Sequence, residues 1–163
     1  MTSLRRAIHL RLLQVFGRLP RAARLRVVRV LVPTYTVGAI CVIEQPDGRM
    51  LLVRHVYRER WGFPGGLVKR NEDIADGARR EALEEVGMAI ELVGEPAVVV
   101  AADARRVDIV YRCRPAAGAD PDAVRPTSPE ILEVRWVPRD ELPELQHEAA
   151  EGLVALARAV DPS

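Results

Sequence analysis

Three glutamates near the middle of the chain, Glu81, Glu84 and Glu85, have the spacing and chemistry of a metal site. On a helix, where successive residues turn by about 100°, the spacing i, i+3 and i+4 places them on one arc about 100° wide. Three negative charges within one turn repel each other, and hard divalent cations such as Mg²⁺ prefer carboxylate oxygens. Arg80 can hydrogen-bond to a carboxylate and orient it. Taken alone, the glutamates favour a solvated acidic face; the residues around them decide between the two interpretations.

A helix between glycines must position these carboxylates. Gly65 and Gly66 precede a helix-like run of about 13 residues, and Gly87 ends it with a residue suited to the left-handed conformation. Asp73 is suited to cap the start of this helix. A second arc is apolar and is predicted to face a core; its members are Ala75, Ala78, Ala82, Leu83 and Val86.

The stretch from Gly66 to Met88 resembles the Nudix box, the signature of the MutT-like Nudix hydrolases. Five residues separate Gly66 from Glu72, and seven more lead to the sequence Arg80-Glu81-Ala82-x-Glu84-Glu85-x-Gly87-Met88. Every fixed position of the box is occupied. The likeness extends from about residue 34 to about residue 145.

The resemblance implies a fold and an activity. The fold is the Nudix fold of the α/β class, an α/β/α sandwich with a central mixed sheet. The activity is that of a pyrophosphohydrolase dependent on Mg²⁺ or Mn²⁺, which cleaves the diphosphate linkage of a nucleoside diphosphate derivative with metal-activated water. A divalent cation neutralises the phosphates and lowers the pKa of bound water. A nucleotide-binding module that does not cleave its ligand is the alternative.

The resemblance also assigns roles within the box. Glu84 and Glu85 are implied metal ligands, and Glu81 is a ligand or, through a water, the general base. The Gly66 carbonyl is a further implied ligand, since glycine lets the backbone approach a metal closely. Arg80 is expected to orient the glutamates.

Charged residues outside the box are candidates for substrate binding. Arg54, Arg58 and Arg60 lie in or beside a basic loop and could bind phosphates, because anions need fixed cations; equally, they could simply be solvated. Glu130 or Glu133, around the last strand, could supply a further carboxylate near the metal.

The remaining elements follow from hydrophobic pattern and turn residues. Strands are predicted at 35–44 and 49–54, paired as a hairpin, with a buried strand through 98–100 and a final strand at 131–137. A long loop is predicted at 115–129 and a closing helix at 144–160.

Residues 1–32 form a basic, partly amphipathic helical extension before a Nudix domain at 33–163. The extension holds eight arginines and no acidic residue, so it carries +8, and the remaining residues carry −7 of the chain's net +1. Its apolar stripe could pack on the domain or on a partner subunit, as in a homodimer. Alternatively it could bind an anionic surface, which could be phospholipid headgroups, a nucleic acid or an acidic protein; a membrane would suit a hydrolase of a lipid-linked diphosphate. No specific nucleic-acid site is evident.

The two cysteines, Cys41 and Cys113, lie in strand-like runs and are expected to be buried hydrophobic residues in a reducing cytosol. No apolar run approaches 18 residues, and arginines interrupt the N-terminal segment throughout. The expected location is therefore the cytoplasm, with peripheral membrane association through residues 1–32 left open.

Overall fold

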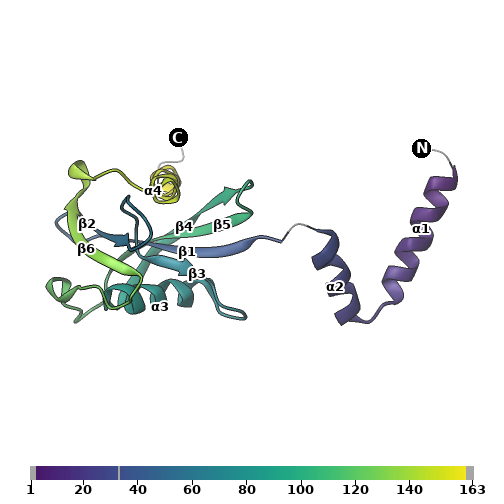
Figure 1. Ribbon diagram of the computed structural model, residues 1–163, viewed down its shortest axis with the longest axis horizontal. Helices are drawn as coiled ribbons and strands as arrows, with labels where there is room; N and C mark the ends of the chain where they lie inside the picture. Colours follow the sequence, from purple (N-terminus) through teal and green to yellow (C-terminus); the bar gives the residue numbers. More distant parts are fainter. Residues whose placement is uncertain (1–2, 33, 161–163) are drawn as a thin grey trace. The chain divides into compact units, whose positions relative to one another are not determined.

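The computed structural model describes residues 3–32 and 34–160, in two compact units, Met1–Tyr35 and Thr36–Ser163. The first unit holds helices α1 (Ser3–Arg18) and α2 (Arg21–Leu31). The elements of the second are β1 (Thr36–Ile43), β2 (Arg49–His55), β3 (Gly65–Leu67), α3 (Ile74–Val86), β4 (Ile90–Ala101), β5 (Arg106–Pro115), the 3₁₀ helix η1 (Pro121–Ala123), β6 (Ile131–Pro138), the 3₁₀ helix η2 (Arg139–Glu141) and α4 (His147–Val160) (Figure 1).

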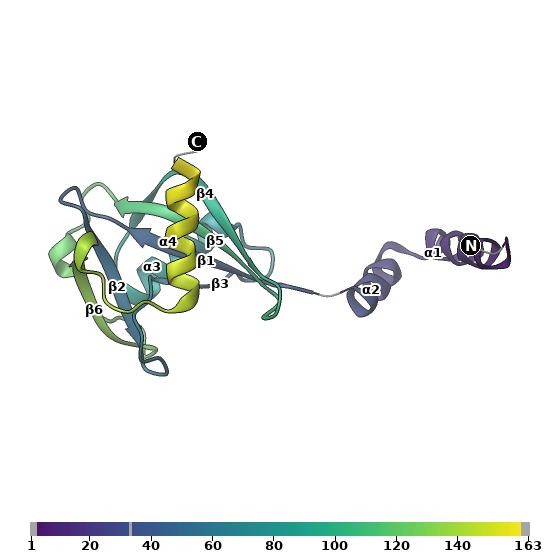
Figure 2. The same ribbon diagram turned by 90° about the horizontal axis from the view of Figure 1, so that it is seen from above.

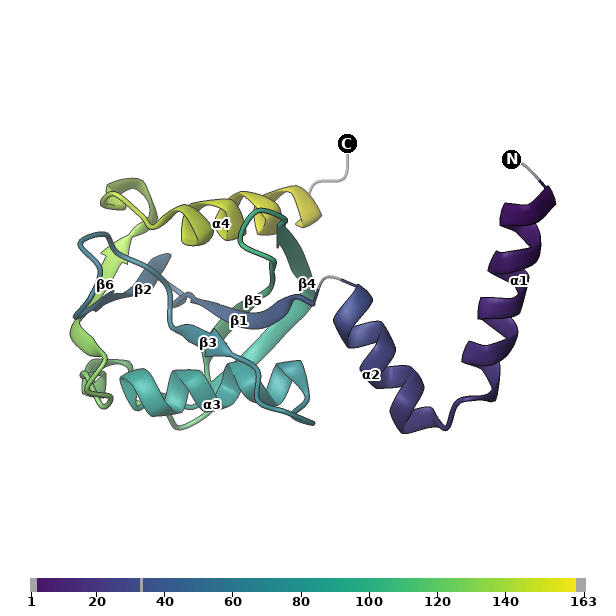
Figure 3. The same ribbon diagram turned by 45° about the vertical axis from the view of Figure 1, so that its right-hand side comes forward.

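A mixed sheet forms the centre of the second unit. Its strand order is β3-β1-β5-β4, in which β1 and β5 are parallel and the other neighbours are antiparallel. Strands β2 and β6 form a separate antiparallel pair. Helices α3 and α4 lie on opposite sides of the strands (Figures 2 and 3). This is the α/β arrangement with a central mixed sheet that the resemblance implies.

Alternation along β1 supplies both cores, because successive strand residues point to opposite faces. Ala39, Cys41 and Ile43 join the buried cluster on the α3 side, whereas Ile40 and Val42 join the one on the α4 side. A strand buried on both faces reads as a continuous apolar run, which explains the sequence of this segment. Cys41 is a free, buried thiol, as is Cys113, so both are hydrophobic core residues.

Two strand predictions are wrong. Strands β1 and β2 do not form a ladder with each other; they meet at one isolated bridge, Glu44 to Met50, and β2 pairs with β6 instead. Both sides of β1 are already taken by β3 and β5. Val98 and Val100 are 59% and 60% exposed rather than buried, because β4 is the last strand of the sheet and these residues face away from the core.

The first unit consists of two basic helices, which confirms the predicted helical extension and resolves residues 21–31 as helix. Pro20 stands at the N-cap of α2, where its missing N–H is not needed. None of the residues of α2 is buried. Among the described residues, no helix is both long and apolar enough to cross a membrane.

Candidate active site

Helix α3 presents the box glutamates, and its ends are capped as its sequence predicts. The Asp73 side chain accepts a hydrogen bond from the Ala75 N–H at 2.9 Å. At the other end Gly87 has φ of 68°, the left-handed conformation that glycine adopts without cost. Asn71, in the turn before the helix, also has a positive φ of 63°, which asparagine tolerates better than most residues.

The buried side of α3 is rotated from the predicted one. Leu83 is 56% exposed, so its assignment to the core is wrong, whereas Glu85 is buried. On a helical wheel Glu85 lies between the directions of Ala78 and Glu81, while Leu83 points well past Ala82. The core-facing arc is therefore centred between Glu85 and Ala82, which places one carboxylate at the edge of the core.

Arg80 binds three carboxylates at once. It donates to both oxygens of Glu72, at 2.7 and 3.0 Å, to Glu81 at 2.6 Å and to Glu84 at 3.0 Å. A fifth bond, at 3.3 Å, reaches the Leu67 carbonyl. The Arg80 side chain is only 18% exposed, so these charge-assisted bonds form largely away from water. The planar guanidinium fork fixes the positions of Glu72, Glu81 and Glu84.

These contacts shift proton affinities in opposite directions. Hydrogen bonds from Arg80, and then from the Lys69 N–H, lower the pKa of Glu72 to about 2. Burial raises the pKa of Glu81, while Arg80 opposes the rise. The hydrogen bond to Glu72, followed by those to Glu81 and Glu84, raises the pKa of Arg80 above its ordinary value. Glu72 is thus a fixed anion, and Glu81 is the box carboxylate whose affinity for a proton is raised.

Glu85 is held by the glycine turn and by a histidine. Its Oε2 accepts a hydrogen bond from the Gly65 N–H at 2.9 Å, and its Oε1 lies 3.6 Å from Nε2 of His55. A Cβ at the neighbouring Gly66 would lie 2.6 Å from the carboxylate carbon of Glu81, so any larger residue there would displace the Glu81 carboxylate. The backbone of β3 and two box carboxylates therefore pack against each other.

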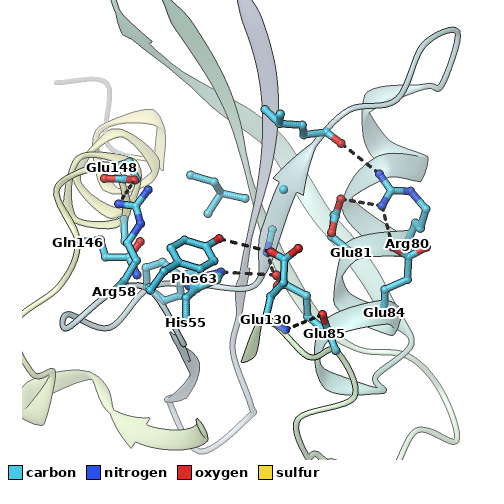
Figure 4. Close-up of a pocket in the computed structure, with 18 of the residues that line it drawn as sticks. His55, Arg58, Phe63, Arg80, Glu81, Glu84, Glu85, Glu130, Gln146 and Glu148 are labelled. Carbon is cyan, nitrogen blue, oxygen red and sulfur yellow. Dashed lines mark hydrogen bonds and ion pairs between the residues drawn. The ribbon is translucent and has the colours of Figure 1, made fainter. Parts of the chain in front are cut away.

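A cavity of about 590 Å³ opens beside these groups (Figure 4). One wall comes from β3, α3 and the loop between them, and it carries Gly65 and the box residues Gly66, Leu67, Lys69, Arg80, Glu81, Glu84 and Glu85. The rest of the lining comes from other segments: Ile40, His55, Tyr57, Arg58, Gly62, Phe63, Arg106, Ser128, Glu130, Gln146, Glu148 and Ala149. The volume is in the range of a small-molecule site.

The wall facing the box has its own polar groups, which the sequence did not identify. Glu148, in the first turn of α4, pairs with Arg58 at 2.7 Å, and Arg106 donates to the buried Asp108 at 2.7 Å. Gln146 donates through Nε2 to the Arg60 carbonyl at 3.0 Å and leaves its Oε1 without a donor among the described residues. These residues belong to no motif, and only the fold brings them to the cavity.

The candidate substrate residues divide into two groups. Arg58 lines the cavity; Arg54, Arg60 and Glu133 are not among the residues that line it. Arg54 pairs with Glu133 at 2.8 Å, and Arg60 pairs with the exposed Glu144 at 2.6 Å. Glu130 does line the cavity, with the Tyr57 hydroxyl 3.5 Å from its carboxylate.

The donors on the box wall fit a hard divalent cation chemically. Glu81, Glu84 and Glu85 offer carboxylate oxygens, and Gly66 lines the same cavity. Within residues 3–32 and 34–160, however, no three such side chains already converge as a metal cluster. The reason lies in their contacts: Glu81 and Glu84 are bound to Arg80, and Glu85 to the Gly65 N–H.

Comparison with known proteins identifies the family. A model described as NUDIX domain matches residues 34–157. The chain belongs to the Nudix hydrolase family, whose members act on acid anhydrides in phosphorus-containing compounds.

Particular relatives agree with this assignment. The chain is 32% identical over 112 residues to a MutT-like protein of Streptomyces ambofaciens, covering 69% of this chain and 70% of that one. It is 34% identical over 113 residues to a CMP-5'-(N-acetyl-N-hydroxy-3-aminopropyl)phosphonate hydrolase of Streptomyces rubellomurinus, covering 66% and 54%. The fold superposes with a TM-score of 0.65 on a MutT Nudix hydrolase from Burkholderia pseudomallei, at 29% identity over 76% of this chain and 98% of that one.

Proposed function

We propose that this protein is a Mg²⁺-dependent pyrophosphohydrolase that cleaves the diphosphate linkage of a nucleoside diphosphate derivative, with Mn²⁺ as an alternative ion. The observation that carries the proposal is the box wall of the cavity. Glu81, Glu84 and Glu85 line a space of about 590 Å³ together with Gly66, so three carboxylates border one substrate-sized site. The family and the names of the relatives support the same reaction class.

Gly66, Glu81, Glu84 and Glu85 are the residues that would hold the ion. When bound there, a divalent cation supplies neutralisation of the phosphate charge and a lower pKa for a coordinated water. To bind the ion, Glu81 and Glu84 would each give up the hydrogen bond from Arg80. The two hydrogen bonds from Arg80 to Glu72 would keep the guanidinium in place. Arg80 thus orients the carboxylates both before and after binding.

The proton acceptor is proposed to be Glu81, or a water positioned by it. Its burial raises its pKa, and an acceptor whose pKa approaches the operating pH is more effective. Glu130 is a second carboxylate that lines the cavity from outside the box. Arg58 and Lys69 also line it and are the proposed contacts for substrate phosphates. Arg54, Arg60 and Glu133 stay predictions for substrate binding.

The substrate moiety beyond the diphosphate would occupy the α4 side of the cavity, beside Phe63, Gln146 and Glu148. A relative named as the hydrolase of a CMP-linked phosphonate suggests including cytidine compounds among the candidates. A lipid-linked diphosphate is the hypothesis that depends on the basic extension rather than on the cavity. A cytoplasmic location is proposed with the support of two free, buried cysteines, and a homodimer stays a prediction.

The test is a hydrolysis screen of nucleoside diphosphate derivatives with Mg²⁺ or Mn²⁺, read as release of phosphate or nucleoside monophosphate. We expect turnover that EDTA abolishes. Glu84→Gln and Glu85→Gln should each lower kcat by at least about 100-fold with unchanged circular dichroism. Glu95→Gln, at an exposed glutamate on β4, is the matched control and should retain turnover. Binding of nucleotides without any product would support the non-catalytic alternative, and normal turnover in both box variants would refute the proposed site.

A further inference from the structure

The two helices of the first unit combine positive charge with exposed apolar side chains. Residues 3–32 contain eight arginines and no aspartate or glutamate. Large apolar side chains on both helices are 43–83% exposed, from Val28 at the lower end to Val30 at the upper. An isolated exposed leucine needs no explanation, but a contiguous series of them on one element marks an interaction surface.

On α1 three of the five exposed large apolar side chains share one face, whereas Leu10 and Leu13 lie on the other side of the helix. Ile8, Leu12 and Val15 follow at spacings of four and three residues, so they lie within an arc of about 60°. Their side chains are 52%, 63% and 57% exposed. Arg11 and Arg18 border this arc, and long arginine side chains can extend past an apolar face to place their charges at a polar boundary.

The composition favours a lipid surface over a single-stranded nucleic acid. Proteins that bind single strands place aromatic side chains against the bases, and residues 3–32 hold a single aromatic residue, Phe16. An anionic bilayer instead requires cationic residues beside aliphatic ones, without a fixed shape. Because residues 33–163 carry −7, an anionic leaflet would repel the rest of the chain, so attraction has to come from this extension.

We infer that residues 3–32 are a membrane-surface docking element for anionic phospholipid bilayers, with α1 lying along the interface through Ile8, Leu12 and Val15. The inference is independent of the proposed hydrolysis, because none of the cavity residues belongs to this segment. It places a hydrolase of phosphoric anhydrides at a membrane surface and does not depend on which substrate the enzyme cleaves.

The size of the effect follows from the charges. Each arginine near an anionic leaflet strengthens binding by about fivefold, so replacing three should weaken it by about 100-fold. Loss of aliphatic side chains at three positions should weaken it by at least about tenfold. Raising NaCl from about 0.1 to about 0.5 M should weaken binding strongly, since the screening length falls with ionic strength.

The experiment is co-sedimentation of the full chain with vesicles of phosphatidylcholine, alone or mixed with phosphatidylglycerol. One variant removes charge by Arg5→Gln, Arg11→Gln and Arg18→Gln. A second removes apolar side chains by Ile8→Ala, Leu12→Ala and Val15→Ala, which preserves helix propensity. The matched control replaces three exposed arginines of the second unit, Arg125, Arg139 and Arg158, by glutamine.

We expect binding to the mixed vesicles only, lost in both extension variants and retained in the control. If both extension variants sediment with the vesicles to the same extent as the unmodified chain, the inference is overturned. Binding to a single-stranded RNA without binding to vesicles, or an equal loss in the control variant, would also overturn it. Hydrolysis of soluble substrates, measured on the same samples, should be equal in all variants, so a failure of the proposed activity remains distinguishable from a failure of docking.

Discussion

Replacing Arg80 by glutamine removes the one cation that holds three carboxylates of the box. In the unmodified chain Arg80 makes four hydrogen bonds to Glu72, Glu81 and Glu84, and Glu72 and Glu81 are themselves only 16% and 14% exposed. Glutamine offers one amide group in place of five guanidinium donors. The variant therefore leaves at least two partly buried carboxylates without a cationic partner.

The expected loss of stability without metal is about 2 kcal/mol and comes from Glu81, the most enclosed of the three carboxylates. Losing a hydrogen bond to such a charged group costs about 1.5–3 kcal/mol, whereas the exposed Glu84 adds little. For a domain of this size such a loss lowers Tm by about 6 °C. Added Mg²⁺ should restore part of it, because the unpaired carboxylates then have another cation to bind.

The measurement is urea unfolding followed by circular dichroism, in EDTA and in Mg²⁺. The matched control is Arg79→Gln, one residue away on the same helix. Arg79 pairs with Asp76 at 2.9 Å, but the two side chains are 49% and 71% exposed, so its loss should cost less than about 0.5 kcal/mol. Equal losses in the two variants would refute the view that Arg80 organises the site.

The pH dependence of stability gives an independent check on the role of Arg80. Arg80 lowers the pKa of Glu72 from its ordinary 4.5 to about 2, so the stability that Glu72 contributes is complete above about pH 5 and lost as pH falls towards 2. The stability difference between the unmodified chain and the Arg80→Gln variant should therefore be constant near neutral pH and shrink over this acidic range. A difference that grows on acidification would contradict the assigned cause.

Two further substitutions test the neighbouring groups. Burial raises the pKa of Glu81, so the stability that Glu81 contributes is largest at low pH and is lost as the pH rises. In urea unfolding at pH 7 in EDTA, Glu81→Gln should therefore be at least as stable as the unmodified chain. In the turnover assay the same variant should lose at least about 100-fold in kcat. Gly66→Ala would place a Cβ 2.6 Å from the Glu81 carboxylate carbon and should lower kcat by about 100-fold. Gly77→Ala, whose Cβ would meet a Glu72 oxygen at 3.2 Å, is its control in the turnover assay and should stay within about threefold.

Local features of this chain were predictable because their causes are local. The Asp73 cap and the left-handed Gly87 follow from a few adjacent residues, and both are present. Pairing between distant strands is different. The turn between β1 and β2 suggested a hairpin, but β1 is bordered by β3 and β5, and the sequence of a strand does not state which neighbours it will have.

The candidate site also combines residues that local spacing predicts with residues that only the fold brings together. The box carboxylates reach the cavity because one helix carries all three, so their relative position was set by spacing alone. Arg106, Gln146 and Glu148 come from β5 and the start of α4, and no spacing within the sequence relates them to the box. Leu83 was misassigned because an apolar residue beside the core-facing arc was read as part of it, whereas Glu85 occupies the buried position.

Charge balance on the box wall explains why a divalent cation suits it. The glutamates on or directly behind this wall are Glu72, Glu81, Glu84 and Glu85, and the cations that bind them are Arg80 and Lys69, so four negative and two positive charges leave −2. One Mg²⁺ would neutralise this excess.

A diphosphate entering the cavity would bring further negative charge, and the cations on the other walls are already engaged. Arg58 is paired with Glu148 and Arg106 with Asp108, at 2.7 Å in each case. Neither guanidinium can neutralise a phosphate fully without leaving a carboxylate unpaired, which is costly in a partly buried site. The substrate should therefore bind together with its own divalent cation, so the concentration of free Mg²⁺ that gives half-maximal turnover should fall as substrate concentration rises.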